Sequence, residues 1–298
     1  MIEVWQLNKK FGQLEVLKGL DLNVGKGSIY GLVGSNGAGK TTLLKLLAGI
    51  YKPDSGSIRI AGQPVFENVQ VKEKIIFIPD ELFYFNQYSI KETAAFFRQV
   101  YPTWDEKRFQ ELSTVFGIDM QRRVTKLSKG MKRQVSFWLA LSVKPEMLIL
   151  DEPLDGLDPM IRSKVKKLLM ADVAEREMSI LISSHNLREL EDICDCMGIL
   201  HDGSLLIESE LDSLKRGINK VQIAFPGEFP DELLKDETIL YHETRGSVHL
   251  CIMRGEEQDI KARLQQLQPL LLDVLPLTFE EISVYEMGGV GYDIHNIL

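Results

Sequence analysis

The stretch GSNGAGKT, residues 34–41, decides the fold that we predict for this chain. It follows the apolar run SIYGLV (28–33), which reads as a strand, and leads into the predicted helix KTTLLKLLAG (40–49). The spacing matches the pattern GxxxxGK(S/T), a loop whose backbone N–H groups surround phosphate. A simple glycine-rich turn is the alternative, but the strand before it and the helix after it favour the phosphate loop.

Each position in this loop has a physical role in binding phosphate. The three glycines carry no side chain, so successive N–H groups can turn inward around an anion at the helix N-terminus. The lysine reaches the outer phosphates and the first threonine offers its hydroxyl to Mg²⁺. We therefore predict that a nucleoside triphosphate binds to the following residues: Gly34, Ser35, Asn36, Gly37, Ala38, Gly39, Lys40, Thr41 and Thr42.

A second apolar segment ends in two carboxylates. In MLILDEP (147–153), four apolar residues precede Asp151 and Glu152. Adjacent acids are common in solvated loops, but a strand this apolar is typical of a sheet interior. We expect Asp151 to contribute to the magnesium site and Glu152 to face the attacking water.

The segment LSKGMKRQ (127–134) makes a family resemblance specific. It is similar to the signature LSGGQ of ABC transporter nucleotide-binding subunits, and it lies shortly before the strand at 147–153, as in that family. The resemblance covers roughly residues 1–210, with the motifs in the family's order. The chain thus resembles the ATP-binding subunit of an ABC transporter, of the exporter type. This implies an α/β P-loop cassette with a RecA-like core sheet, an antiparallel β subdomain and a helical subdomain at about 81–145.

The resemblance also implies roles for residues that carry no signal alone. Phe11 corresponds to the aromatic residue that stacks on adenine, and His185, in ISSH (182–185), to the switch histidine that contacts the γ-phosphate. Alone, each is better explained by packing, and only the order of the other motifs reverses this. The implied catalytic residues are Glu152, His185 and Lys40. The implied D-loop consists of Gly156, Leu157 and Asp158.

The signature segment is expected to act on a partner's nucleotide. Ser128 and Gly130 open a predicted helix with basic residues close behind, which makes an N-terminal anion site with no phosphate of its own nearby. In the family this site binds the ATP of the facing cassette, which implies a homodimer or heterodimer around two MgATP. The residues expected to act in trans are Leu127, Ser128, Lys129, Gly130 and Met131.

One position departs from the family pattern. After the strand IIFIP (75–79) the family commonly has glutamine, whereas this chain has Asp80. A carboxylate suits Mg²⁺, directly or through water, better than it suits a bare γ-phosphate. Gln87 is the alternative register, and we favour Asp80 because the strand and Pro79 fix its position. The predicted metal ligands are Thr41, Asp80 and Asp151.

An aromatic loop follows at once. Phe83, Tyr84 and Phe85 lie in a predicted loop, where burial in a core is a weaker explanation than in a helix. In the family this region contacts the short coupling helix of a transmembrane partner. We therefore expect integral membrane subunits to dock near these three rings.

Composition excludes several classes of protein. With 44% hydrophobic residues the chain is globular, and no apolar run reaches the ~18 residues of a membrane span. Its N-terminus lacks a signal-peptide layout, so we expect it in the cytoplasm, on the inner face of the membrane. The net charge of -8 argues against general nucleic-acid binding. Cys194 and Cys196 have the wrong spacing for a zinc site.

The pattern changes beyond KRGIN (215–219), so we expect an ABC domain at 1–216 and an accessory α+β domain at 217–298. In the second, strand-like and helix-like segments follow in the order β-α-β-β-α-β, with helices at 230–236 and 256–267. That order is typical of ferredoxin-like domains.

Two classes of function fit these motifs. The first is an ATPase subunit that drives transport through separate membrane chains. The second is a soluble ABC ATPase that acts on ribosomes or DNA, or that serves regulation or stress signalling without moving a substrate. The ribosomal members generally carry two cassettes and the DNA-acting members long coiled coils, and this chain shows neither, which favours the transporter. The substrate path belongs to the partner, so this sequence carries no sign of the substrate.

Overall fold

The computed structural model of this chain describes residues 1–210, 217–227, 229–230, 233, 236–275, 277–278 and 281. The chain divides into two compact units, Met1–Glu208 and Ser209–Leu298. The boundary expected between residues 216 and 217 adjoins 211–216, which lie outside the described residues. Within the described part, no helix is both long enough and apolar enough to cross a membrane.

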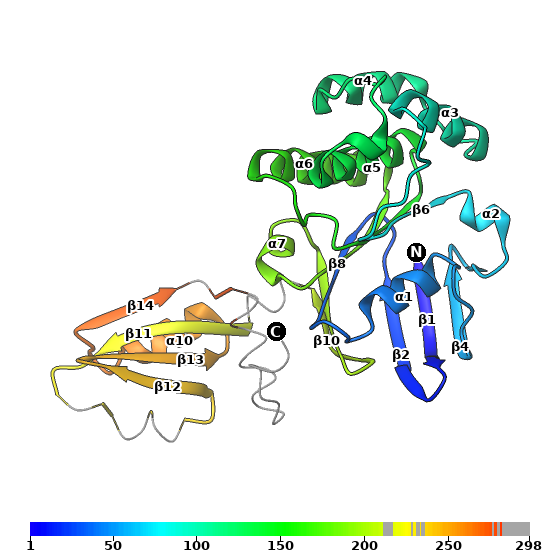
Figure 1. The fold of residues 1–298 in the computed structure, drawn as a ribbon. Helices are drawn as coiled ribbons and strands as arrows, with labels where there is room; N and C mark the ends of the chain where they lie inside the picture. Colours follow the sequence, from blue (N-terminus) through cyan, green and yellow to red (C-terminus); the bar gives the residue numbers. More distant parts are fainter. Residues whose placement is uncertain are drawn as a thin grey trace. The chain divides into compact units, whose positions relative to one another are not determined.

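A six-stranded sheet forms the centre of the first unit (Figure 1). Its strands, in spatial order, are β10 (Ser204–Glu210), β9 (Cys196–His201), β3 (Ile29–Val33), β8 (Ser179–Ser184), β7 (Met147–Asp151) and β6 (Ile75–Ile78). The pairs β9–β3, β3–β8, β8–β7 and β7–β6 are parallel. Every residue of β3, β7 and β8 is buried, as expected for strands covered on both faces. The predicted strands before the loop and before the paired acids are therefore confirmed.

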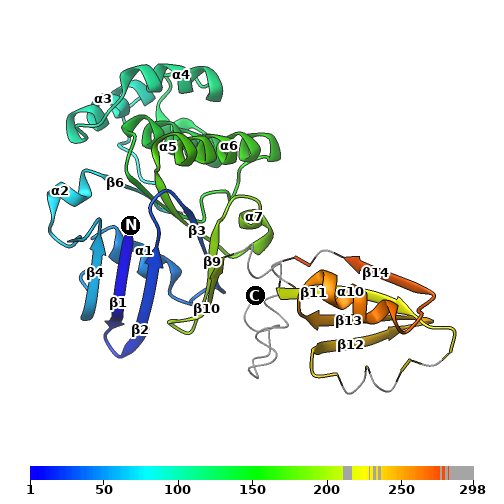
Figure 2. The ribbon, with the colours of Figure 1, turned by 180° about the vertical axis from the view of Figure 1, so that it is seen from behind.

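Helix α1 (Lys40–Leu47) lies between this sheet and an antiparallel one (Figures 1 and 2). The second sheet has the order β2 (Leu14–Val24), β1 (Ile2–Phe11), β4 (Ser55–Ile60) and β5 (Gln63–Pro64). Leu43, Leu44, Leu46 and Leu47 of α1 are fully buried in one cluster with residues of both sheets. Because packing on both sides fixes α1, it also fixes the loop at its N-terminus.

A helical region lies at one end of the first unit (Figure 1). The helices after α1 are α2 (Val69–Lys72), α3 (Ile90–Val100), α4 (Glu106–Phe116), α5 (Lys129–Val143), α6 (Pro159–Arg176) and α7 (Leu187–Glu191), with the 3₁₀ turn η1 (Val124–Lys126) before α5. Ser89 and Glu92 form a capping box that starts α3. Phe109 and Phe116 of α4 stack on Trp138 of α5, with ring centroids 4.9 and 6.3 Å apart. These rings join α4 to the helix that begins at the signature segment.

The second unit contains a four-stranded antiparallel sheet in the order β12-β13-β11-β14. Its elements are β11 (Ile218–Ala224), β12 (Ile239–Arg245), β13 (Val248–Arg254), α10 (Glu257–Gln265) and β14 (Leu271–Leu275). Ile260 and Leu264 of α10 pack on Val221 and Cys251 of the sheet. The helix predicted at 230–236 falls mostly outside the described residues, so the complete ferredoxin-like order remains a prediction.

We predict that Trp138→Ala destabilises the first unit by about 3–5 kcal/mol, the usual cost of removing a fully buried large ring. Trp138 has no exposed surface, and its Nε1 donates to the carbonyl oxygen of Phe109 at 2.8 Å. The midpoint of urea unfolding, followed by circular dichroism, measures the change. Trp5→Ala is the matched control, because Trp5 is 67% exposed and its loss should change stability by less than about 0.5 kcal/mol. Equal effects of the two substitutions would contradict this packing.

Candidate active site

The glycine-rich loop between β3 and α1 forms a pocket of about 340 Å³. Gly37 and Gly39 have φ angles of 87° and 108°, in the left-handed region that glycine adopts without strain. A Cβ atom at Gly34 would lie 2.3 Å from the carbonyl oxygen of Leu200, so only glycine fits there. The pocket is lined by Val16, Ser35, Asn36, Gly37, Gly39, Lys40, Thr41, Thr42, Asp80 and Glu152. Gly34 and the buried Ala38 belong to the loop but are not among the residues that line the pocket.

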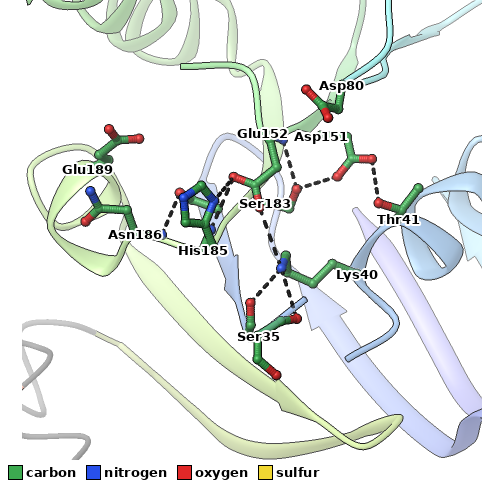
Figure 3. A network of polar contacts seen from close by, with 12 residues as sticks. Ser35, Lys40, Thr41, Asp80, Asp151, Glu152, Ser183, His185, Asn186 and Glu189 are labelled. Carbon is green, nitrogen blue, oxygen red and sulfur yellow. Dashed lines mark hydrogen bonds and ion pairs between the residues drawn. The ribbon is translucent and has the colours of Figure 1, made fainter. Parts of the chain in front are cut away.

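Lys40 is held at this pocket by its own loop (Figure 3). Its Nζ atom donates to the carbonyl oxygens of Gly34 at 2.6 Å and Ser35 at 3.3 Å, and it lies 3.6 Å from Oε1 of Glu152. The side chain is 7% exposed, so the charge is shielded from bulk water. A shielded ammonium in a loop of glycines is suited to charge-assisted hydrogen bonds with phosphate oxygens.

A chain of hydrogen bonds links the loop helix to two strands (Figure 3). The Thr41 hydroxyl donates to Oδ2 of Asp151 at 2.8 Å, and the Ser183 hydroxyl donates to Oδ1 of the same carboxylate at 2.8 Å. The backbone N–H of Glu152 in turn donates to the Ser183 hydroxyl oxygen at 3.1 Å. The Asp151 carboxylate is buried, and both of its oxygens accept a bond, so its position is fixed by α1, β7 and β8 together.

Glu152 is held in a strained conformation beside Lys40 and His185. Its φ angle of 45° is uncommon for a residue with a side chain, and such strain persists where the surroundings enforce it. The backbone N–H of His185 donates to Oε2 of Glu152 at 3.2 Å, and its ring Nδ1 lies 2.9 Å from the same oxygen. His185, predicted to meet the γ-phosphate, thus contacts the carboxylate that is predicted to face the attacking water.

The signature segment and the D-loop touch each other. Ser128 is the N-cap of α5, and its hydroxyl accepts a hydrogen bond from the backbone N–H of Met131 at 3.2 Å. A Cβ atom at Gly130 would lie 2.8 Å from the carbonyl oxygen of Gly156, so glycine is required where the two segments meet. Asp158 caps α6 by accepting from the N–H of Ile161 at 3.0 Å. Leu127 and Leu157 are buried, while Ser128 and Lys129 are exposed.

Asp80 lines the nucleotide pocket, as its predicted role requires, but it also has a partner that the sequence did not indicate. Its Oδ1 atom accepts from Nη2 of Arg133, on α5, at 2.9 Å. Gln87, the alternative register, is exposed and does not line this pocket. This placement favours Asp80 over Gln87.

Phe11 lies at the end of β1 and is 44% exposed. It packs edge-on against Tyr51, with centroids 5.4 Å apart, and Lys9 lies over its ring. It does not line the loop pocket, whereas Val16 of the next strand does. Stacking of Phe11 on adenine therefore remains a prediction.

The aromatic loop has two outward rings and one inward ring. Phe83 is 86% exposed and Phe85 is 46% exposed. The Tyr84 hydroxyl instead donates to the carbonyl oxygen of Lys132, on α5, at 3.1 Å. Burial of this ring raises the pKa of the Tyr84 hydroxyl above its usual range. The loop is thus anchored to α5 through Tyr84.

The oxygen donors at the pocket suit magnesium that arrives with phosphates. Within the described residues, no group of three or more His, Cys, Asp or Glu side chains is arranged as a metal site. Mg²⁺ is usually bound by one or two carboxylates together with substrate phosphates and waters, rather than by an all-protein cage. Thr41 and Asp80 line the pocket and Asp151 is bonded to the Thr41 hydroxyl, so the oxygen donors predicted to hold Mg²⁺ are of this type.

Comparison with known proteins identifies the family. The family model described as "ABC transporter" matches residues 17–155. The ABC transporter ATP-binding protein YtrB of Bacillus subtilis (strain 168) is 35% identical over 289 residues, covering 97% of this chain and 99% of that protein. This chain is an ABC transporter ATP-binding subunit. The Nod factor export ATP-binding protein I of Paraburkholderia xenovorans (strain LB400) is 30% identical over 306 residues, covering 96% of this chain and 97% of that protein.

A solved structure is also similar to this chain. The structure described as the ATP binding subunit of an ABC transporter has a TM-score of 0.68 and 27% identity, covering 72% of this chain and 92% of that chain. The predicted family, cassette fold and ATPase activity are therefore confirmed. The comparisons favour the transport role over a soluble ATPase that acts on ribosomes or DNA.

Three residues of this site in the ATP-binding subunit were not predicted from the sequence. Val16 carries no motif signal, because an apolar strand residue is common everywhere. Arg133 lies in the signature segment, and its charge was expected to add to the anion site at the start of α5. That expectation is wrong, because its guanidinium is buried and bonded to Pro79 and Asp80. Ser183 had a weak signal, since a hydroxyl at the end of an apolar strand next to His185 is unusual in a sheet interior. Its contacts with Asp151 and Glu152 become visible only when β7 and β8 are paired.

We predict that Ser183→Ala lowers the ATPase turnover rate by about tenfold while the protein stays folded. The substitution leaves an oxygen of buried Asp151 and the N–H of Glu152 without their partner, at a cost of about 1–3 kcal/mol. Steady-state ATP hydrolysis, with circular dichroism as a check on folding, measures the effect. Ser142→Ala is the matched control, because Ser142 is equally buried but its hydroxyl donates to a carbonyl oxygen of α5 itself, that of Trp138. Unchanged turnover in Ser183→Ala would contradict a role for this hydroxyl.

Proposed function

We propose that this subunit closes head to tail with a second ABC subunit around two MgATP and thereby drives export through separate membrane subunits. The dimer proposal rests on the separation of two features suited to binding phosphate, the glycine-rich loop at 34–41 and the N-terminus of α5. None of the signature residues 127–131 is among the described residues that line the loop pocket. Ser128 and Lys129 stand exposed at the N-terminus of α5, where backbone N–H groups and the helix dipole favour an anion.

The proposed chemistry is hydrolysis of the γ-phosphate by water. Glu152 is the general base, held in place by His185 and by the N–H bond to Ser183. Lys40, whose Nζ lies 3.6 Å from Oε1 of Glu152, neutralises charge on the phosphates. Magnesium, when bound, would be held by Thr41, Asp151 and Asp80 and would supply further charge neutralisation on the phosphate oxygens.

Glu152→Gln should lower ATP hydrolysis by about 10²-fold or more, the usual scale for losing a general base. The variant should also remain as an ATP-bound dimer, because the ATP that bridges the two chains is no longer hydrolysed. Size-exclusion chromatography with and without MgATP, beside steady-state turnover, measures both effects. The matched control is Glu146→Gln, since Glu146 is exposed and its carboxylate forms a surface ion pair with Lys74 at 3.0 Å, away from the nucleotide pocket. A Glu152→Gln chain that hydrolyses ATP normally, or that stays monomeric with MgATP, would contradict the proposal.

The proposed membrane partner docks on an apolar groove beside the aromatic loop. A cavity of about 240 Å³ is lined mainly by side chains of β6, the aromatic loop, α3 and α5. Phe85 contacts Tyr88 and Phe96 in this patch, with centroids 4.9 and 5.6 Å apart. Exposed aromatic clusters of this kind are typical of protein interfaces. We infer that the occupant is a short helix of a membrane subunit, which would keep this chain on the cytoplasmic face.

The direction of transport in this proposal is outward. Its support is the exporter-type resemblance of the sequence and the full-length similarity to a protein named for Nod factor export. The second unit of this chain is included in that similarity, because 96% of the chain is covered.

Replacing both Phe83 and Phe85 by serine should leave soluble ATPase near normal but abolish copurification with the membrane subunits. Both rings are exposed, so their loss removes interface area with little effect on the core. Pull-down from native membranes and soluble ATP hydrolysis are the two measurements. Tyr84→Phe is the control: it removes the bond to Lys132 but keeps the ring, and should retain the membrane subunits. A complex that survives the double substitution would exclude this loop from docking.

A further inference from the structure

Arg133 is a buried arginine whose Nη1 and Nη2 atoms bond to one turn, Pro79–Asp80, while its Nε atom has no partner among the described residues. Its side chain is 1% exposed, and arginine is almost never fully buried unless it is paired. Nη1 donates to the carbonyl oxygen of Pro79 at 2.8 Å, and Nη2 donates to both the carbonyl oxygen and Oδ1 of Asp80, each at 2.9 Å. Among the described residues, Asp80 is the one carboxylate within ion-pair distance of this guanidinium.

Asp80 is engaged on one side only. Oδ1 is bonded to Arg133, while Oδ2 has no hydrogen-bond partner in the described part of the chain. The side chain is 54% exposed and lines the pocket together with Lys40 and Thr41. A carboxylate with one oxygen fixed and the other free at a phosphate pocket has the form of a pre-oriented metal ligand.

We propose that Arg133 is a positioning residue for Asp80, and that the two form a matched pair in place of the glutamine that is common at position 80 in the family. The bond to Oδ1, together with the two backbone bonds at Pro79 and Asp80, fixes the turn after β6 and leaves Oδ2 for the magnesium of MgATP. This inference rests on the proposed function, in which Asp80 contributes to the metal site.

The pair also connects two places that serve different nucleotides. Arg133 lies on α5, five residues after Ser128, which caps that helix at the signature segment. Asp80 lies at the pocket of the chain's own loop. Arg133 therefore ties the metal side of one ATP site to the helix that is proposed to meet the partner's ATP.

Because of this pair, the effect on stability of placing the family's usual glutamine at position 80 should depend on whether Arg133 is present. In Asp80→Gln the buried Arg133 loses its counter-charge, and an unpaired buried charge is strongly destabilising. In the double variant Asp80→Gln/Arg133→Gln no buried charge is left alone, so thermal stability should return toward that of the wild type. If Arg133 and Asp80 did not interact, the losses of thermal stability from the two single substitutions would add in the double variant instead.

The test uses the full chain and a fluorescent ATP analogue, and it records the Mg²⁺ concentration that half-saturates the metal-dependent gain in binding. Arg133→Gln should raise this concentration by about tenfold, the usual scale for losing a support of a metal ligand, with binding in EDTA unchanged. Asp80→Gln should raise it by at least as much, and the double variant no further. Arg133→Lys, which keeps the charge but not the fork of donors, should fold and give a smaller rise.

Arg108→Gln is the matched control. It breaks another partly buried pair, Arg108 with Asp172 at 2.9 Å, whose members do not line the nucleotide pocket, so it should lower stability but not Mg²⁺ dependence. If Asp80→Gln raises the Mg²⁺ requirement while Arg133→Gln and Arg133→Lys do not, the positioning role is overturned and the metal role of Asp80 stands. If Asp80→Gln itself leaves Mg²⁺ dependence unchanged, the metal role fails and the pair fails with it.

Discussion

The hydrogen bond from the Thr41 hydroxyl to the Asp151 carboxylate is the link on which the rest of the site depends. It joins the helix that follows the phosphate loop to the strand that carries the acids, and the bond from Ser183 to Asp151 extends the link to β8. Because Asp151 is buried, leaving either of its oxygens without a partner is costly. Three elements that are far apart in sequence thus meet at one carboxylate.

Around this link the polar groups are divided between two functions. Lys40, Glu152 and His185 form a contiguous set on the side of the chain's own loop (Figure 3). The N-terminus of α5 contacts the D-loop instead, through the close approach of Gly130 to Gly156. In this arrangement the residues expected to act in hydrolysis are separate from the helix N-terminus that is expected to bind an anion. In the proposed dimer, that division makes each ATP site depend on both chains.

The sequence alone was sufficient to predict the elements whose chemistry depends on neighbouring residues in the chain. The loop at 34–41 and the strand ending at Asp151 combine glycine spacing, apolar runs and charge in ways that few other structures satisfy. The sequence was not sufficient to predict the role of a residue whose contacts come from an element far away in the chain. Ser183 acquires its contacts from the register of β8 against β7, and Arg133 acquires Asp80 from the packing of α5 beside β6. The inward turn of Tyr84 between two outward rings likewise depends on a carbonyl of α5.

The claim that each ATP site is shared between two chains is tested most directly by complementation between two disabled variants. Lys40→Ala removes a chain's own phosphate contact, and Ser128→Arg blocks the helix end that is proposed to reach the partner's ATP. We predict that each variant alone is nearly inactive, and that an equal mixture regains ATPase activity because the mixed dimer contains one intact site. A Ser128→Arg chain that hydrolyses ATP normally by itself, or a mixture no more active than its components, would contradict the shared site.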